Sequence, residues 1–288
     1  MPVPLAFSTN AFTRFSVVHA IESIARAGFA GVEILADEPH VYPLKMDILT
    51  RDVAGALSRT NLRVSNVNAN CTFGYWADGP AEAFFEPSLI SPVKKRRDDR
   101  IAMIRRTLRF AKDVGARNIS ITSGRMTGGM RPERAAEQLH ESLKPILDDA
   151  EMLGIDVGIE LEPGLFLEYV DELVDWIGRI GSTRLGANLD VGHCQVIGES
   201  IPASVRALKG RIWNLHIEGM PGRKHYHLIP GDPADTLDWP GLWSALHETA
   251  YARFATVELY TMTEDPDHAP RQSFAWLSAS VAALRVKR

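Results

Sequence analysis

The sequence contains little cysteine. Among its 288 residues there are only two, Cys71 and Cys194. Two cysteines cannot build the disulfide framework of a small secreted protein or a zinc site made of cysteine ligands. The N-terminus also lacks the basic segment and apolar stretch of a signal peptide. These absences predict a reducing, cytoplasmic setting.

An excess of positive charge and a long apolar run are missing as well. The chain has 32 Lys and Arg residues against 36 Asp and Glu residues, for a formal net charge of -4. Such a chain has no overall positive field to attract nucleic acid or an anionic membrane surface. No apolar run is long enough to cross a bilayer. We therefore expect neither nucleic acid nor a membrane among its partners.

The sequence does contain a regular alternation of short β-rich runs and longer helical patterns. The predicted strands are residues 4–10, 31–35, 63–70, 118–124, 156–163, 184–190, 212–219 and 255–260. The predicted helices are residues 17–27, 46–60, 97–114, 132–153, 167–180, 203–208, 240–251 and 271–284. This order of elements is typical of an α/β protein with a parallel sheet.

Eight strand–helix units in fewer than 300 residues predict a (β/α)8 TIM barrel. A doubly wound sheet is the alternative, but no GxGxxG motif follows the first predicted strand. No Pro-, Ser- or Gly-rich linker divides the chain. The sequence therefore predicts one barrel domain that spans residues 1–288.

The last four predicted strands carry polar residues in alternation with apolar ones. Near their C-terminal ends lie Glu162, Asp190, His216 and Glu258. The C-terminal ends of barrel strands form the face on which TIM-barrel active sites are built. We therefore expect three carboxylates and one imidazole to point at the same place.

Three carboxylates in a partly enclosed site repel one another and lose hydration, so a cation is needed to compensate. Three oxygens and one nitrogen suit Mn²⁺ first, then Mg²⁺ or Co²⁺, with Zn²⁺ as a further option. Glu160 lies one inward position below Glu162, and we expect it to support the site without binding the ion. His193, three residues after Asp190, should begin the next loop and contact the metal or the substrate.

Two further polar residues lie on earlier predicted strands. Asn68, near the end of the third strand, is placed to hydrogen-bond a substrate hydroxyl. Glu33, on the second strand, has two equally good interpretations: it reaches the mouth of the barrel, or it pairs with a nearby arginine inside it.

Several motifs resemble those of the sugar phosphate isomerase/epimerase superfamily, the xylose isomerase-like TIM barrels. They are ARAGFAGVEI, ELEPG, NLDVGH, NLHIEG, HLIPGD and TVELY, and they are spread over essentially the whole chain. The resemblance implies a single divalent metal ion held by Glu162, Asp190, His216 and Glu258.

The same resemblance implies roles in a reaction. Glu162 and Glu258 would act as the acid/base pair, one on each side of a bound sugar carbon. His193, Arg223 and His227 would contact the substrate. The implied activity is a metal-dependent isomerase or epimerase of a ketose or keto-polyol. It removes a proton next to a carbonyl to give an enediolate and returns it to the opposite face or the neighbouring carbon.

Three alternatives share this fold. A dehydratase or lyase of keto-inositols or 3-keto-sugars would use the same metal and the same acid/base pair. An AP endonuclease-like DNA repair enzyme needs histidines at the ends of the third and fourth strands, where this sequence has VNANCT and ITSGRM. A catalytically silent barrel would not need four intact ligands. The resemblance also implies that the chain could form a homo-oligomer, because oligomers are common in the superfamily.

Overall fold

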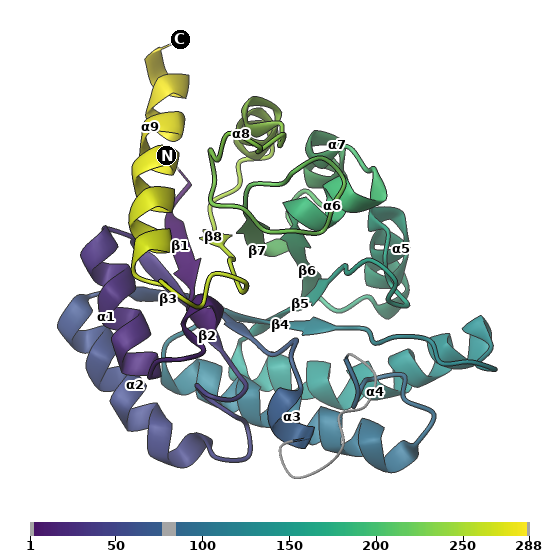
Figure 1. Cartoon of the computed structure of the whole chain (residues 1–288). Coiled ribbons are helices and arrows are strands. Elements are labelled where there is room, and N and C mark those ends of the chain that lie inside the picture. The colour runs from purple at the N-terminus through teal and green to yellow at the C-terminus, as the bar shows by residue number, and fades with distance from the viewer. Residues whose placement is uncertain (1–2, 77–84, 287–288) are drawn as a thin grey trace.

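Eight parallel strands close into a ring in the computed structural model, which describes residues 3–76 and 85–286 (Figure 1). Each strand pairs with the next in the sequence, and β8 pairs with β1. The strands are β1 Leu5–Ser8, β2 Gly31–Leu35, β3 Arg63–Asn68, β4 Asn118–Thr122, β5 Asp156–Glu160, β6 Leu185–Asp190, β7 Ile212–Ile217 and β8 Ala255–Val257. The predicted TIM barrel is thus confirmed.

Helices surround this ring (Figure 1). Within the described residues they are α1 Val17–Ala27, α2 Met46–Thr60, α3 Lys94–Asp113, α4 Pro132–Leu153, α5 Val170–Ile180, α6 Val191–Ile197, α7 Ile201–Ala207, α8 Trp239–Glu248 and α9 His268–Val286. Two short 3-10 helices, η1 Thr9–Phe12 and η2 Phe73–Trp76, follow β1 and β3. No helix of residues 3–76 and 85–286 is both long and apolar enough to cross a membrane.

Helix α6 lies where the sequence analysis expected a loop. It begins directly after β6 because Asp190 serves as its N-cap: Oδ1 accepts a hydrogen bond from the backbone N–H of His193 at 2.9 Å. Gly198, in the left-handed region at φ 86°, ends the helix. His193 therefore lies in the first turn of a helix, which fixes its position relative to Asp190.

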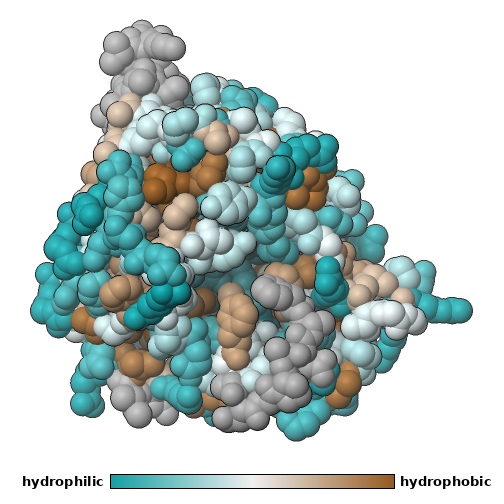
Figure 2. All heavy atoms as spheres, in the orientation of Figure 1, coloured by the Kyte–Doolittle hydropathy of each residue, from teal (hydrophilic) through white to brown (hydrophobic). Residues whose placement is uncertain are grey.

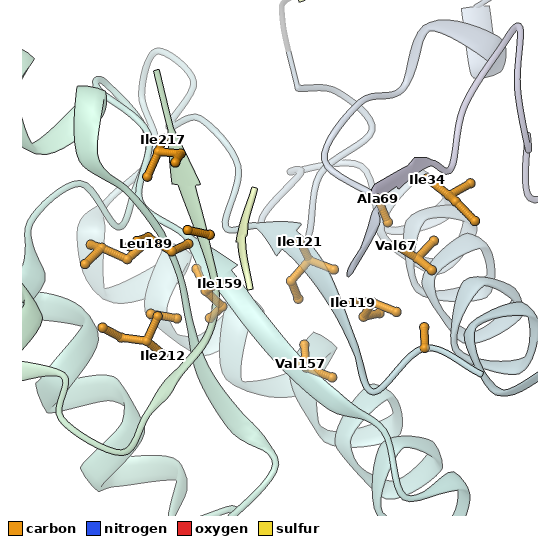
Figure 3. Packing of buried hydrophobic residues seen from close by; sticks show 14 of the residues in the cluster. Ile34, Val67, Ala69, Ile119, Ile121, Val157, Ile159, Leu189, Ile212 and Ile217 are labelled. Carbon is orange, nitrogen blue, oxygen red and sulfur yellow. The ribbon is translucent and has the colours of Figure 1, made fainter. Parts of the chain in front are cut away.

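Apolar side chains on the outer face of the strands form the core between sheet and helices. Ile119 and Ile121 on β4, Ile159 on β5 and Leu189 on β6 are fully buried there (Figure 3). Figure 2 shows hydrophilic residues over much of the rim of the visible face, with hydrophobic patches between them. Burial of this apolar layer holds the ring of strands in shape.

The inner face of the strands is polar. Asn66 on β3 donates to Glu33 Oε2 at 2.8 Å and to Ser120 Oγ at 2.9 Å, and it accepts from Asn118 at 2.8 Å. Asn214 on β7 donates to Asn188 Oδ1 at 2.8 Å. A connected network of this kind satisfies buried polar groups, and it fixes the rotamers of the side chains that lie above it.

Asn66 offers a test of this polar interior. We expect Asn66→Leu to destabilise the fold by about 3 kcal/mol, because it removes buried hydrogen bonds to a carboxylate, a hydroxyl and an amide. Urea unfolding would measure the change. The control Ile121→Leu conserves volume on the outer face of β4 and should cost less than about 1.5 kcal/mol. Equal stability of the wild type and Asn66→Leu would show that the inner network does not contribute to stability.

Candidate metal centre

Four side chains from consecutive strands converge at the C-terminal end of the barrel. Glu160, Asp190, His216 and Glu258 each offer one ligand atom, and these four atoms lie within 4.8 Å of one another. All four residues are buried. His216 Nδ1 lies 3.4 Å from Glu160, 3.8 Å from Asp190 and 3.6 Å from Glu258. We call these residues the four-residue group.

The structure places Glu160, and not the expected Glu162, in this group. Strand β5 ends at Glu160, and the chain then turns, with the N–H of Leu165 bonded to the carbonyl of Glu162 at 3.0 Å. Glu162 therefore stands above the strand end, and its side chain is 14% exposed. Its oxygens face His193 at 3.5 Å and His225 at 3.9 Å.

Glu33 fixes the orientation of His216. Its carboxylate lies 2.7 Å from His216 Nε2, and both side chains are fully buried. A carboxylate accepts the hydrogen of Nε2, which leaves Nδ1 with its lone pair directed at the four-residue group. Within residues 3–76 and 85–286, Glu33 has no arginine partner, and its fully buried side chain lies below the mouth of the barrel. Glu33 is the buried partner of the histidine.

Asparagine amides hold the two glutamates of the group. Asn10 donates to Glu258 Oε1 at 2.9 Å, and Asn68 donates to the same atom at 3.3 Å. Asn70 donates to Glu160 Oε2 at 2.7 Å, and Asn188 donates to that oxygen as well. Asn68, expected at a substrate hydroxyl, thus positions Glu258. Asn10 was not predicted as a site residue, although its position just after the first strand places it at the same end of the barrel as Glu258.

The charges of the site suit a divalent cation. In the described part of the chain, every ion pair of these carboxylates has a histidine partner, and none has lysine or arginine. Oδ2 of Asp190 is buried without a hydrogen-bond partner. Three carboxylates and one imidazole nitrogen form a donor set that Mn²⁺, Co²⁺ and Zn²⁺ accept. The residues present therefore fit a bound divalent metal.

Proton affinities in the metal-free site show the same excess of negative charge. Burial raises the pKa of Glu258 well above its usual range, and it raises the pKa of Glu162 to about 7, with Glu160 and Asp190 adding to the effect. Burial opposes a charged His193, but Asp190 and Glu162 raise its pKa to about 9. Glu33, Glu258 and Glu160 likewise outweigh burial and raise the pKa of His216 well above its usual range.

Three histidines lie beside the four-residue group. His225 Nε2 is 3.0 Å from His193 Nε2 and 3.3 Å from His227 Nε2. His193 Nδ1 lies 2.7 Å from the backbone oxygen of Leu161, and His227 Nδ1 lies 2.9 Å from the backbone oxygen of Glu258. His193, His225 and His227 therefore lie close to the site, and the substrate contacts expected of His193 and His227 stay a prediction.

The loop after β7 positions His227 and directs Arg223 away. Gly219 and Leu228 pair as an antiparallel bridge, and Asp235 accepts hydrogen bonds from the N–H groups of Met220 and Leu237, both at 3.0 Å. Arg223 is exposed and donates to the carbonyl of Val196 in α6 at 3.0 Å. The structure therefore does not bring Arg223 to the four-residue group.

A comparison with protein families and known proteins gives consistent matches. Residues 21–280 match the family model described as xylose isomerase-like TIM barrel. Fructoselysine 3-epimerase of Shigella flexneri is 22% identical over 253 residues, which cover 86% of this chain and 87% of that protein.

Solved structures match over nearly the full length. A D-tagatose 3-epimerase-like protein superposes with a TM-score of 0.81 at 17% identity, covering 99% of both chains. The IOLI protein, solved with a binding zinc atom, superposes with a TM-score of 0.77 at 16% identity, covering 97% of this chain and 98% of that one. At these identities the structural matches establish the fold.

The raised pKa values predict how pH acts on the metal-free protein. Between pH 6.5 and 9 the folded state holds more protons than the unfolded state, because Glu162 titrates near 7 and His193 near 9 while their unfolded values lie at or below 6.5. A raised folded pKa, in an acid or a base, stabilises at low pH, and the gain is lost as pH rises through the folded value. With EDTA present, the free energy of unfolding should fall by about 1 kcal/mol per pH unit across this window.

Urea unfolding at several pH values, with EDTA or with excess Mn²⁺, would measure this slope. Bound metal replaces the protons, so Mn²⁺ should flatten the dependence. A stability that rises with pH in EDTA would contradict the proposed charge balance.

Proposed function

Because the chain belongs to the xylose isomerase-like TIM barrel family, we propose that it is an enzyme that epimerises or isomerises a sugar at a carbon next to a carbonyl, with one divalent metal ion. The observation that supports this proposal most is the four-residue group of three carboxylates and one imidazole. The relative and the structural neighbour named for 3-epimerase activity favour epimerisation over elimination. The name of the zinc-containing neighbour supports a metal in this fold.

Glu160, Asp190, His216 and Glu258 would hold the metal. A bound divalent cation polarises the carbonyl of the substrate and stabilises the negative charge that develops when the neighbouring proton leaves. Mn²⁺ suits the mixed oxygen and nitrogen donors best among the common ions, with Co²⁺, Mg²⁺ and Zn²⁺ as alternatives.

Glu162 is the carboxyl suited to take the proton. It is partly exposed, it accepts no hydrogen bond from a side chain within the described residues, and burial brings its pKa to about 7. A general base works best when its pKa lies near the working pH. The two tasks expected of Glu162 are thus divided in this proposal: Glu160 binds the metal, and Glu162 moves a proton.

Glu258 would serve as the second proton carrier, from the β8 side of the barrel. Asn10 and Asn68 hold its Oε1, and its Oε2 lies 3.8 Å from His227 Nδ1. Two carboxyl groups that reach the substrate from β5 and β8 can act on its two faces. Removal of a proton by one and delivery by the other inverts the carbon between them.

The partly exposed groups around Glu162 mark where a sugar would enter. His225 is 30% exposed at its side chain, and the ring of Tyr260, 44% exposed, lies 4.8 Å from the ring of His227. His193 and His225 offer polar ring atoms for hydroxyl groups. Tyr260 offers an aromatic face for the apolar side of a sugar ring.

The division of tasks between Glu160 and Glu162 can be tested with a matched pair of variants. Glu160→Gln should lose metal binding by more than tenfold, because it removes one charged ligand. Glu162→Gln should bind metal within about threefold of the wild type and lose proton exchange by about 100-fold or more. Calorimetric titration with Mn²⁺ measures binding, and wash-in of solvent deuterium into a panel of free ketoses measures exchange.

The same experiment distinguishes the reaction classes. Deuterium incorporation with formation of an epimer or isomer supports the proposed function, whereas appearance of an enone or dione chromophore would identify a dehydratase. Full exchange activity in Glu162→Gln would rule out its role as a proton carrier.

Glu33 gives a separate prediction, because it touches the histidine and not the substrate. We expect Glu33→Gln to weaken Mn²⁺ binding by about 10- to 100-fold, since the neutral amide no longer fixes the hydrogen on His216 Nε2. Calorimetry gives the affinity, and circular dichroism checks that the barrel is intact. An unchanged affinity in a folded variant would show that Glu33 has no part in orienting the ligand.

A further inference from the structure

Glu218 is a buried carboxyl that the proposed reaction does not use. It directly follows β7 and is 0% exposed, and neither of its side-chain oxygens has a hydrogen-bond partner in the part of the chain that the structure describes. A buried carboxyl without a partner is costly, so a native structure needs something to compensate for it.

The fold makes room for this carboxyl next to α6. A Cβ atom on Gly192, in the first turn of α6, would lie 1.9 Å from Glu218 Oε1. Only glycine at this position lets the carboxyl approach the start of the helix. Glu218 is therefore packed into a defined place, directed toward Asp190 at the N-cap.

Two unpartnered acids meet at that place. Asp190 Oδ2 likewise has no hydrogen-bond partner among the described residues. Asp190, Glu218 and His227 each offer one ligand atom, the three atoms lie within 4.8 Å of one another, and all three residues are buried. His227 Nδ1 faces the carbonyl oxygen of Glu258 at 2.9 Å, so its hydrogen lies there and Nε2 carries a lone pair.

The neighbouring cluster of His193, His225 and His227 differs from this trio in one respect. His225 Nε2 lies 3.0 Å from His193 Nε2 and 3.3 Å from His227 Nε2, so a hydrogen on one of these atoms can bond to a neighbouring one. Among the described residues, Oδ2 of Asp190 and both side-chain oxygens of Glu218 have no hydrogen-bond donor. The buried oxygens that lack a compensating hydrogen or cation are therefore those of Asp190 and Glu218.

We propose that Asp190, Glu218 and His227 form a second divalent-cation site, adjacent to the four-residue group and sharing Asp190 with it. This inference rests on the proposed function because Asp190 belongs to both sites. Two oxygen ligands and one imidazole suit Mn²⁺, Co²⁺ or Zn²⁺. Pairs of metal ions in enzymes stabilise charge on two neighbouring substrate oxygens, which is the chemistry that a second ion would supply here.

Metal stoichiometry tests this proposal on the full-length protein. The chain is stripped with EDTA, reconstituted with Mn²⁺, desalted and analysed by mass spectrometry. We expect two equivalents per chain in the wild type, one in Glu218→Gln, and two in the exposed control Glu137→Gln. The Mn²⁺ electron paramagnetic resonance spectrum should show coupled ions in the wild type and an isolated six-line signal in Glu218→Gln.

Each alternative outcome is decisive. A single equivalent in the wild type, unchanged in Glu218→Gln, would overturn the second site and indicate that the two acids share a proton. Two equivalents in both proteins would place the second ion elsewhere and overturn it too. Glu160→Gln tests the four-residue group separately. If Glu160→Gln lowers the number of bound Mn²⁺ ions and Glu218→Gln does not, the four-residue group binds metal and the second site does not exist.

If Glu218→Gln does not fold, Gly192→Ala provides a second variant, since its methyl group displaces the Glu218 carboxyl. It should also bind one equivalent, and two equivalents in Gly192→Ala would contradict the proposal.

Discussion

Several carboxyl groups are buried inside one barrel, and within the described residues their charged partners are all histidines. The other features of the site follow from this concentration of negative charge. Glu33, Glu160, Asp190 and Glu258 are each less than about one-tenth exposed, and their ion pairs are all with histidine. In a medium of low polarity such a group of like charges is unfavourable unless a cation or protons neutralise it. A bound divalent metal ion would neutralise these charges, and as a Lewis acid it would also assist the proton abstraction that we propose.

The barrel accommodates these buried charges because the two faces of its strands differ: the outer face is apolar and the inner face is polar. Apolar residues on the outer face of each strand, such as Ile159 and Leu189, bury against helices and stabilise the ring. The inner face carries asparagines that donate to the glutamates, so each carboxylate keeps a fixed rotamer before any ligand arrives. Preorganised groups of this kind lose little freedom on binding, which favours both metal affinity and catalysis.

Much of this architecture could be predicted from the sequence because it depends on periodicity. Alternating apolar and polar residues located the strands, and the C-terminal ends of the last four strands indicated Asp190, His216 and Glu258. The choice between Glu160 and Glu162 could not be made in this way. Both lie on the same face, and only the point at which β5 leaves the sheet decides which one reaches the group.

The other differences have the same origin in local backbone geometry. Helix α6 was not predicted because its first turn depends on the cap formed by Asp190, a residue that also belongs to the site. Glu218 was overlooked although it continues the alternation of Asn214 and His216 within the predicted strand 212–219, because the search stopped at one polar residue near each strand end; in the structure β7 ends at Ile217. Arg223 was expected near the site, but the hydrogen bonds to Asp235 fold the loop so that Arg223 faces α6.

Anomalous diffraction from crystals of the protein grown with Mn²⁺ would locate the metal centre itself. We expect an anomalous peak coordinated by Glu160, Asp190, His216 and Glu258, with His216 binding through Nδ1 and Glu33 bonded to Nε2. A peak ligated by Glu162 in place of Glu160, or the absence of any peak among these four residues, would contradict this expectation.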